Sequence, residues 1–196
     1  MKKTSLYALL LLCTFPLLPS AQAGISTDPR LNWKTITSEH FALHYHDGEA
    51  PLAQTTIAIA ERVHTRLSPI FQWTPQEPTN IVLTDQVDFF NGSATPIPTN
   101  TMRLHVTPPE IFTGIEDHAG ALETLITHEY VHILHLDKAT RGPLLMRQFL
   151  GRFLLLFPNA FQPAWLVEGL ATYYETAPER AIGRGQSSAF EMLMRT

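Results

Sequence analysis

The stretch 127–132, with the sequence THEYVH, constrains this chain more than any other part of it. It contains a His-Glu-x-x-His motif, in which the two histidines are four residues apart. On an α-helix this spacing places His128 and His132 one above the other on the same face. Two imidazoles in that position can bind one divalent ion, and Glu129 beside them can accept a proton from water on the ion. The motif therefore predicts a metal site, provided that its surroundings are helical and a third ligand exists.

The surroundings of the motif favour a helix. Residues Ala119–Leu136 contain no proline and carry apolar side chains around the motif, as a buried helix does. A second apolar segment, Pro163–Glu175, contains Glu168. A carboxylate among apolar residues is costly to bury unless it is paired or binds a metal, so Glu168 is the candidate third ligand. The alternative, that both histidines are ordinary core residues, is less favoured once this second segment is considered.

The segments His128–His132 and Trp165–Glu175 resemble those of the gluzincin zinc metallopeptidases, in which a glutamate on a later helix completes a His, His, Glu site. More narrowly, they resemble the peptidase-MA-like domain of bacterial envelope proteins, which often precedes a β-propeller. The resemblance extends over about 33–196, although the gap between the motif and Glu168 is longer than in the thermolysin-like pattern.

The resemblance implies a set of roles and a fold. His128, His132 and Glu168 would be ligands of Zn²⁺, and Glu129 would be the general base. The implied fold is α+β and zincin-like: an N-terminal mixed sheet with an edge strand, a helix that carries the motif, and a later helix that carries the third ligand. The implied activity is hydrolysis of peptide bonds through a metal-activated water.

Residues 1–23 are predicted to be a signal peptide. Two lysines precede the apolar run Leu6–Leu18, and Ala21–Ala23 is a small-residue cleavage site. The alternative is a retained membrane anchor, but the run is short and is interrupted by Pro16. We therefore expect an exported protein of the bacterial periplasm or cell envelope, with one zincin-like domain over 24–196.

The single cysteine, Cys13, lies inside the predicted signal peptide. Leu11 and Leu12 precede it, where a lipoprotein would have small residues, so we expect no lipid there. Without another thiol, any metal must be held by histidines and carboxylates. Removal of the two lysines takes the formal net charge from −4 to −6. This mild acidity offers no case for a nucleic-acid partner, which would need a basic surface. The resemblance implies a peptide or protein substrate.

Alternation of apolar and polar residues predicts strands at Trp33–Thr37 and His40–Tyr45, with a turn between them. His40, His44 and His46 fall on one side of the second strand. They could form a second metal site, but a solvated strand face is favoured because no carboxylate or cysteine is patterned with them.

The following segments alternate between helix, strand and loop. Leu52–Leu67 has apolar residues at helical spacing, and Pro69 is expected to end this helix or to lie just beyond it. Asn80–Thr84 reads as a central strand and Asp85–Asn100 as a loop. Thr101–Val106 alternates again and reads as a strand. The resemblance to zincins implies that it is the exposed edge strand near the metal, which either pairs with an extended peptide substrate or binds nothing.

The segment Leu144–Phe157 is strongly apolar but too short to span a membrane. Burial as a core helix is favoured. The alternatives are an apolar lip over the active site and a surface that contacts the membrane or a further domain. The end of the chain has a loop at Gly183–Ser188 and a helical pattern at Ala189–Arg195 that stops without a cap. We interpret this ending as a possible truncation of a longer protein.

Several further residues have possible roles around the site. Thr113 or Asp117 could cap the central helix, and His135 is expected to be a supporting or core group and not a fourth ligand. Tyr173 or Tyr174 could stabilise the oxyanion of hydrolysis, or both could pack in the core. Glu175 could orient a ligand histidine or be an exposed acid at the end of its helix.

Two functions follow from these patterns. The first is an exported zinc peptidase. The second is a non-catalytic binding or assembly module of the cell envelope that retains the zincin fold. An intact Glu129 favours the enzyme, because a structural metal site has no use for a general base.

Overall fold

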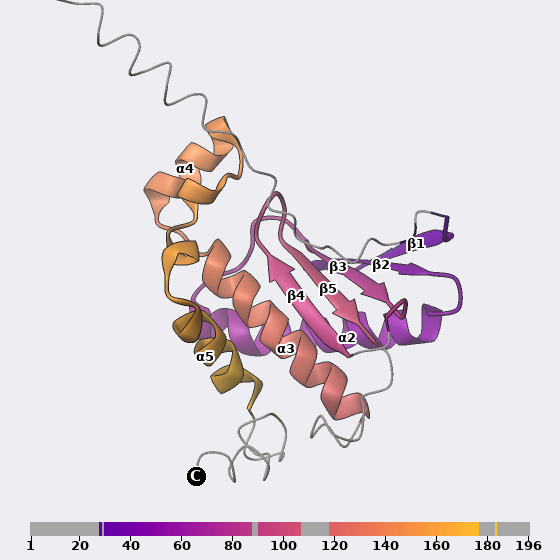
Figure 1. Cartoon of the computed structure of the whole chain (residues 1–196). Helices are drawn as coiled ribbons and strands as arrows, with labels where there is room; N and C mark the ends of the chain where they lie inside the picture. Colours follow the sequence, from indigo (N-terminus) through magenta and orange to yellow (C-terminus); the bar gives the residue numbers. More distant parts are fainter. Residues whose placement is uncertain (1–27, 29, 88–89, 107–117, 177–182, 184–196) are drawn as a thin grey trace, which may run out of the picture.

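The computed structural model describes residues 28, 30–87, 90–106, 118–176 and 183. The chain has an α+β fold with one five-stranded mixed sheet (Figure 1). The strands are β1 (Trp33–Thr37), β2 (Phe41–His46), β3 (Thr79–Thr84), β4 (Asn91–Thr95) and β5 (Thr101–His105). The helices are α2 (Ala50–Phe71), α3 (His118–Asp137), α4 (Arg141–Leu150) and α5 (Ala164–Glu175), with short 3-10 turns η2 (Leu154–Leu156) and η3 (Pro158–Phe161).

Some sequence predictions lie outside the described residues. They are the signal peptide at 1–23, the two candidate caps at Thr113 and Asp117, and the helical pattern at 189–195. Within the described part, no helix is long and apolar enough to cross a membrane.

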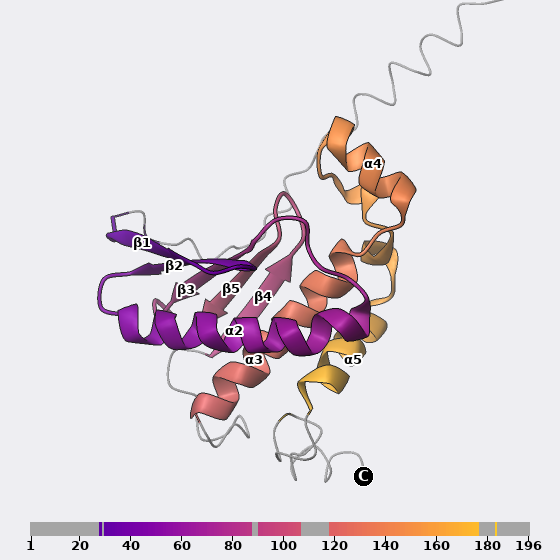
Figure 2. The ribbon, with the colours of Figure 1, turned by 180° about the vertical axis from the view of Figure 1, so that it is seen from behind.

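The sheet has the strand order β1-β2-β3-β5-β4. Its three inner strands, β2, β3 and β5, run parallel, and the two outer strands pair antiparallel with their neighbours. The long helix α2 connects the parallel strands β2 and β3, as such a connection requires. Seen from behind, α2 runs across the whole width of the sheet (Figure 2).

The core lies between the sheet and the two long helices. Side chains at every second position of β2, β3 and β5 are buried, because they face α2 and α3. Helices α2 and α3 pack against each other as well as against the sheet, and α5 packs on α3. The fully buried core residues include Phe41, Leu43, Ile81, Leu83, Met102, Leu104, Ala60, Ile126, Tyr130, Ile133 and Leu134.

The prediction that the segment starting at Thr101 forms the edge strand is wrong, because one further strand lies outside it. The segment starting at Thr101 forms β5, but β5 pairs with β3 on one side and with β4 on the other. The edge is β4, within a stretch that was expected to be a loop. Its sequence, NGSAT, has little intrinsic strand preference, so this strand depends on pairing with β5 and on packing against α3.

Pro69 does not end its helix. Helix α2 continues past it to Phe71, and Gln72 follows in a left-handed conformation whose backbone N–H bonds to the Pro69 carbonyl. The proline lies in the last turn of the helix. Its ring nitrogen cannot donate a backbone hydrogen bond, but so close to the end of the helix this loss does not interrupt a longer helical segment.

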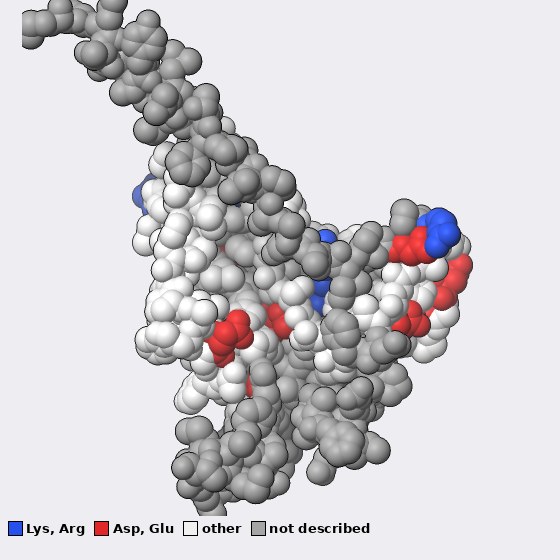
Figure 3. All heavy atoms as spheres, in the orientation of Figure 1, with Lys and Arg blue, Asp and Glu red and all other residues white. Residues whose placement is uncertain are grey.

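The expected burial of Leu144–Phe157 is also wrong. The segment does not form one helix but divides into α4 and η2, which project from the body of the molecule (Figure 1). Phe149 is 80% exposed and Leu155 is 69% exposed. The region over α4 is almost without charged side chains in the space-filling view (Figure 3). Two of the alternatives require an exposed surface: contact with a membrane and contact with a further domain. Both remain predictions.

A buried ion cluster explains why this apolar surface is turned outward. Asp137, at the end of α3, is almost fully buried and accepts hydrogen bonds from Arg147 at 3.2 Å and Arg152 at 2.9 Å. The Arg147 guanidinium also lies 3.8 Å from the centre of the Phe157 ring, which is fully buried. Because both arginines point inward to Asp137, the apolar side chains on the opposite side of the segment face solvent.

Candidate metal centre

Helix α3 places the two motif histidines at the floor of a cleft. His128 and His132 are both buried, and their Nε2 atoms lie 3.1 Å apart. The rings meet edge to face with centroids 4.8 Å apart. A separation of four residues brings both side chains to one face of the helix, so one point in the cleft is within reach of both nitrogens.

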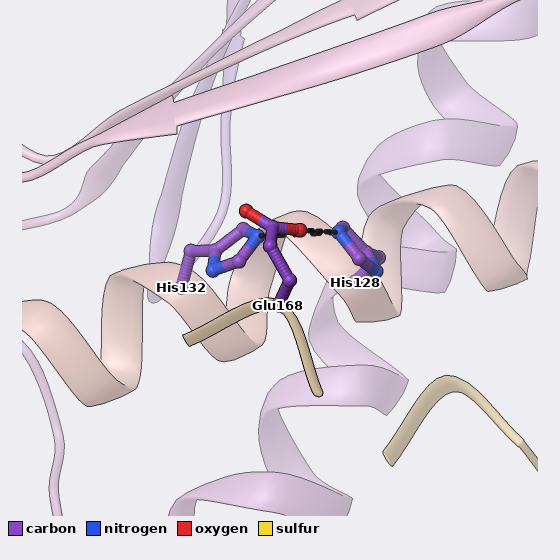
Figure 4. A group of neighbouring side chains, drawn as sticks. All are labelled: His128, His132 and Glu168. Atoms are coloured by element: carbon purple, nitrogen blue, oxygen red, sulfur yellow. Dashed lines mark hydrogen bonds and ion pairs between the residues drawn. The ribbon is translucent and has the colours of Figure 1, made fainter. Parts of the chain in front are cut away.

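Glu168 reaches the same point from the neighbouring helix. Its Oε2 atom lies 3.3 Å from His128 Nε2 and 3.6 Å from His132 Nε2. The three side chains converge on one point from α3 and α5 (Figure 4). Two imidazole nitrogens and one carboxylate oxygen are a donor set that suits zinc and leaves a fourth position open.

Glu168 is not the buried carboxylate that the sequence indicated. Its side chain is 62% exposed, because the first half of α5 lies at the surface and the carboxylate extends from there over the histidines. Two apolar residues just before it are exposed as well, Trp165 at 74% and Leu166 at 37%. The geometric convergence on the histidines, and not burial, makes Glu168 the third member of the group.

Glu175 fixes the orientation and the tautomer of His128. Its Oε2 atom lies 2.7 Å from His128 Nδ1, and Glu175 is only 2% exposed. Because a carboxylate accepts the hydrogen bond, Nδ1 carries the proton, and Nε2 of the neutral ring then presents its lone pair to the cleft. The structure shows the contact between Glu175 and a motif histidine, and the alternative of an exposed acid is wrong. That this histidine is a metal ligand stays a prediction.

Glu129 lies against the edge strand. It is buried, and a β-carbon placed on Gly92 of β4 would be 2.6 Å from its Oε1 atom and 2.8 Å from its Cδ atom. Such distances are shorter than real carbon contacts, so only glycine allows this strand and this carboxylate to approach so closely. No role in the site was predicted for Gly92 from the sequence, because its stretch, Asp85–Asn100, was expected to be a loop.

These residues line a cleft of about 560 Å³. One wall is the strand β4 with Phe90 before it, and the other is formed by α3 and α5. Among the described residues, the lining is Phe90, Asn91, Gly92, Ser93, Ala94, Thr124, Leu125, His128, Glu129, His132, Leu136, Val167, Glu168 and Glu175. An edge strand, a histidine pair and three carboxylates therefore share one open site.

The structure does not bring the two tyrosines into this cleft. Tyr173 is 72% exposed, and the centroid of the Tyr174 ring lies 5.1 Å from that of the Phe71 ring. Neither belongs to the described lining of the cleft. Their placement gives no support to the predicted oxyanion role. His135 also lies outside this lining, in agreement with the expectation that it is not a fourth ligand.

The three histidines near β2 do not form a site together. His40 Nδ1 lies 2.8 Å from Glu61, His44 bonds Thr35 and Asn80, and His46 is turned to Asp85. None of the three is exposed, so the favoured reading of a solvated strand face is wrong as well.

No family model, no curated protein and no solved structure matches this chain. The resemblance to gluzincins therefore depends on the motif residues themselves.

Proposed function

We propose that this chain is an exported zinc-dependent peptidase of the gluzincin type with a zincin-like fold. The observation that carries the proposal is the convergence of His128 Nε2, His132 Nε2 and Glu168 Oε2 on one point of an open cleft. These three residues would hold the zinc ion. When bound, zinc supplies a Lewis acid that polarises a carbonyl and lowers the pKa of water.

Glu129 would act as the general base. It follows His128 on α3 and belongs to the same cleft, so its carboxylate can take a proton from water and pass it to the leaving amine. Gly92 would hold this carboxylate in place by allowing β4 to lie directly against it. Glu175 would keep the proton of His128 on Nδ1 and leave Nε2 for the metal.

The peptide substrate would bind along β4. This strand is the edge of the sheet beyond β5 and forms one wall of the cleft over residues 91–94. A sheet edge offers unpaired backbone N–H and C=O groups, with which an extended peptide can form an added strand. The peptide would then lie across the cleft with a carbonyl near the histidines.

The alternative function, a non-catalytic module of the cell envelope, requires neither a base nor an edge strand beside the metal. The presence of Glu129 and Gly92 in one contact therefore supports the enzyme. Export to the periplasm or cell envelope is part of the proposal and depends on the signal-peptide pattern of residues 1–23.

Metal binding tests the proposal first. We expect the purified protein to retain zinc at this site, and we expect His132→Ala to lose the ion at this site because two ligands hold zinc much more weakly than three. Elemental analysis and chelator competition measure both proteins. Undiminished zinc in the His132→Ala protein would contradict the ligand set.

A further inference from the structure

A second group of potential ligands lies at the carboxyl ends of β2 and β3, outside the described lining of the proposed catalytic cleft. His46 is the last residue of β2, Glu49 is the residue before α2, and Asp85 directly follows β3. Because β2 and β3 are parallel, their carboxyl ends meet at the same edge. Helix α2 begins at that edge, four residues after β2 ends, so the fold brings the three side chains together there.

The distances within this group are those of a ligand set. His46 Nε2 lies 2.9 Å from Asp85 Oδ1 and 3.4 Å from Glu49 Oε2. All three ligand atoms lie within 4.8 Å of one another. Ligands at about 2.1 Å from a tetrahedral zinc ion are about 3.4 Å apart, so an ion fits with small side-chain rotations.

The His46 ring is oriented as a metal ligand would be. Its Nδ1 atom donates to the backbone carbonyl of Asp47 at 3.0 Å. In the neutral ring Nε2 then carries the lone pair, and this nitrogen faces two carboxylates. Lone pairs that face each other repel, so the arrangement requires a cation between them or a proton on Nε2.

Glu49 provides an independent indication of a missing partner. It is 7% exposed, and its Oε1 atom is buried without a hydrogen bond. A buried carboxylate oxygen without a partner is costly, and a bound cation would remove that cost. Asp85, whose side chain is 57% exposed, leaves the group open to solvent on one side, so an ion can enter.

From these contacts we propose that His46, Glu49 and Asp85 bind a second divalent ion of the zinc class, with water as a fourth ligand. One imidazole and two carboxylates suit zinc better than calcium, which prefers oxygen donors alone. The ion would be structural: it would tie the ends of β2 and β3 to the start of α2. The rival arrangement is a metal-free ion triad in which a protonated His46 donates from both nitrogens.

The test counts zinc ions in four versions of the full chain after dialysis against buffered zinc. The second site predicts two ions in the wild type, one in His132→Ala, one in His46→Ala and none in the double variant. A wild type with one ion that is lost in His46→Ala but kept in His132→Ala would support this site and contradict the proposed catalytic one. Equal zinc content in the wild type and His46→Ala would overturn the second site.

Because His46 is buried, His46→Ala could misfold, so two milder variants test the same site without changing this residue. Asp85→Asn removes an exposed ligand charge and should weaken binding of the second zinc by at least about tenfold. Asp47→Asn is the matched control, because the Asp47 carboxylate contacts Lys34 and Asn32 and does not belong to the proposed ligand set. Chelator competition measures both affinities. An unchanged affinity in Asp85→Asn, or an equal loss in both variants, would favour the metal-free ion triad.

Discussion

Gly92 on β4 and Glu129 on α3 are in direct contact, with no room for a β-carbon between the strand and the carboxylate. This contact joins the edge of the sheet to the helix that carries the His-Glu-x-x-His motif. It defines where the proposed general base can lie with respect to a peptide on β4.

Gly92→Ala should lower the turnover rate by about a hundredfold, because the added methyl group displaces the Glu129 carboxylate by the order of an ångström. Zinc content should not change, since no ligand is touched. Turnover on a peptide library and elemental analysis of the same samples measure both effects. Gly142→Ala is the control, because a β-carbon there meets no atom within 4 Å. Full activity of the Gly92→Ala protein would show that this contact has no role in placing the base.

Glu175→Gln should weaken binding of the first zinc by about 10- to 100-fold. Glutamine can still accept the hydrogen bond from His128, but it lacks the negative charge that strengthens this histidine as a ligand. Chelator competition measures the affinity, and the exposed Glu77→Gln is a control with the same change in charge. Equal zinc affinities in the two variants would show that Glu175 does not strengthen metal binding by His128.

Two phenylalanines from the same apolar segment should differ sharply in their effect on stability. Phe157→Ala should lower the free energy of unfolding by about 3–5 kcal/mol, because the ring is fully buried beneath Arg147. Phe149→Ala should change it by less than about 0.5 kcal/mol, because the ring is 80% exposed. Urea unfolding measures both values. A large loss in Phe149→Ala would mean that the surface over α4 is covered in solution.

His64 should make stability depend on pH. Burial, together with the His40 ring stacked on it at 3.7 Å, lowers the pKa of His64 below its ordinary value of 6.5. The unfolded chain therefore binds more protons than the folded one as the pH falls below about 6.5, so the free energy of unfolding decreases. The contribution of His64 is complete above that pH and is lost as the pH falls through the folded pKa.

The measurement is urea unfolding at pH 7.5 and at pH 5.5 for the wild type and for His64→Gln. The wild type should lose more stability on acidification than the variant. His40 and Glu61 form their pair in both proteins, and zinc is kept at the same concentration, so the difference isolates His64. An equal loss in both proteins would contradict the assigned direction of the pKa shift.

The sequence predicted those parts of the site that depend on local spacing. The helix of the motif could be recognised because 119–136 lacks proline and because the two histidines are four residues apart. Glu168 could be selected because it lies in the apolar segment that follows. The order of most other elements was predicted too. Strand β2 begins and ends one residue later than predicted, and β3 begins one residue earlier.

The remainder depends on contacts between distant residues. Strand β4 has a sequence typical of a turn and exists only through its neighbours, so its place at the edge beside Glu129 could not be predicted. Arg147 and Arg152 look like the solvent-facing residues of an apolar helix, but Asp137 holds both of them inside. His46 was grouped with His40 and His44 by their spacing, whereas its actual partners are Glu49, just before α2, and Asp85, just after β3.

The most direct test of the proposed function is peptide hydrolysis by the wild type and by Glu129→Gln, with zinc measured on the same samples. Glutamine keeps the size of the side chain but cannot accept a proton at neutral pH. We predict that the wild type hydrolyses a mixed peptide library and that the variant retains its zinc and is slower by about a hundred- to ten-thousandfold. Equal rates in the two zinc-loaded proteins, or no hydrolysis by the zinc-loaded wild type, would contradict the account of this chain as a zinc peptidase.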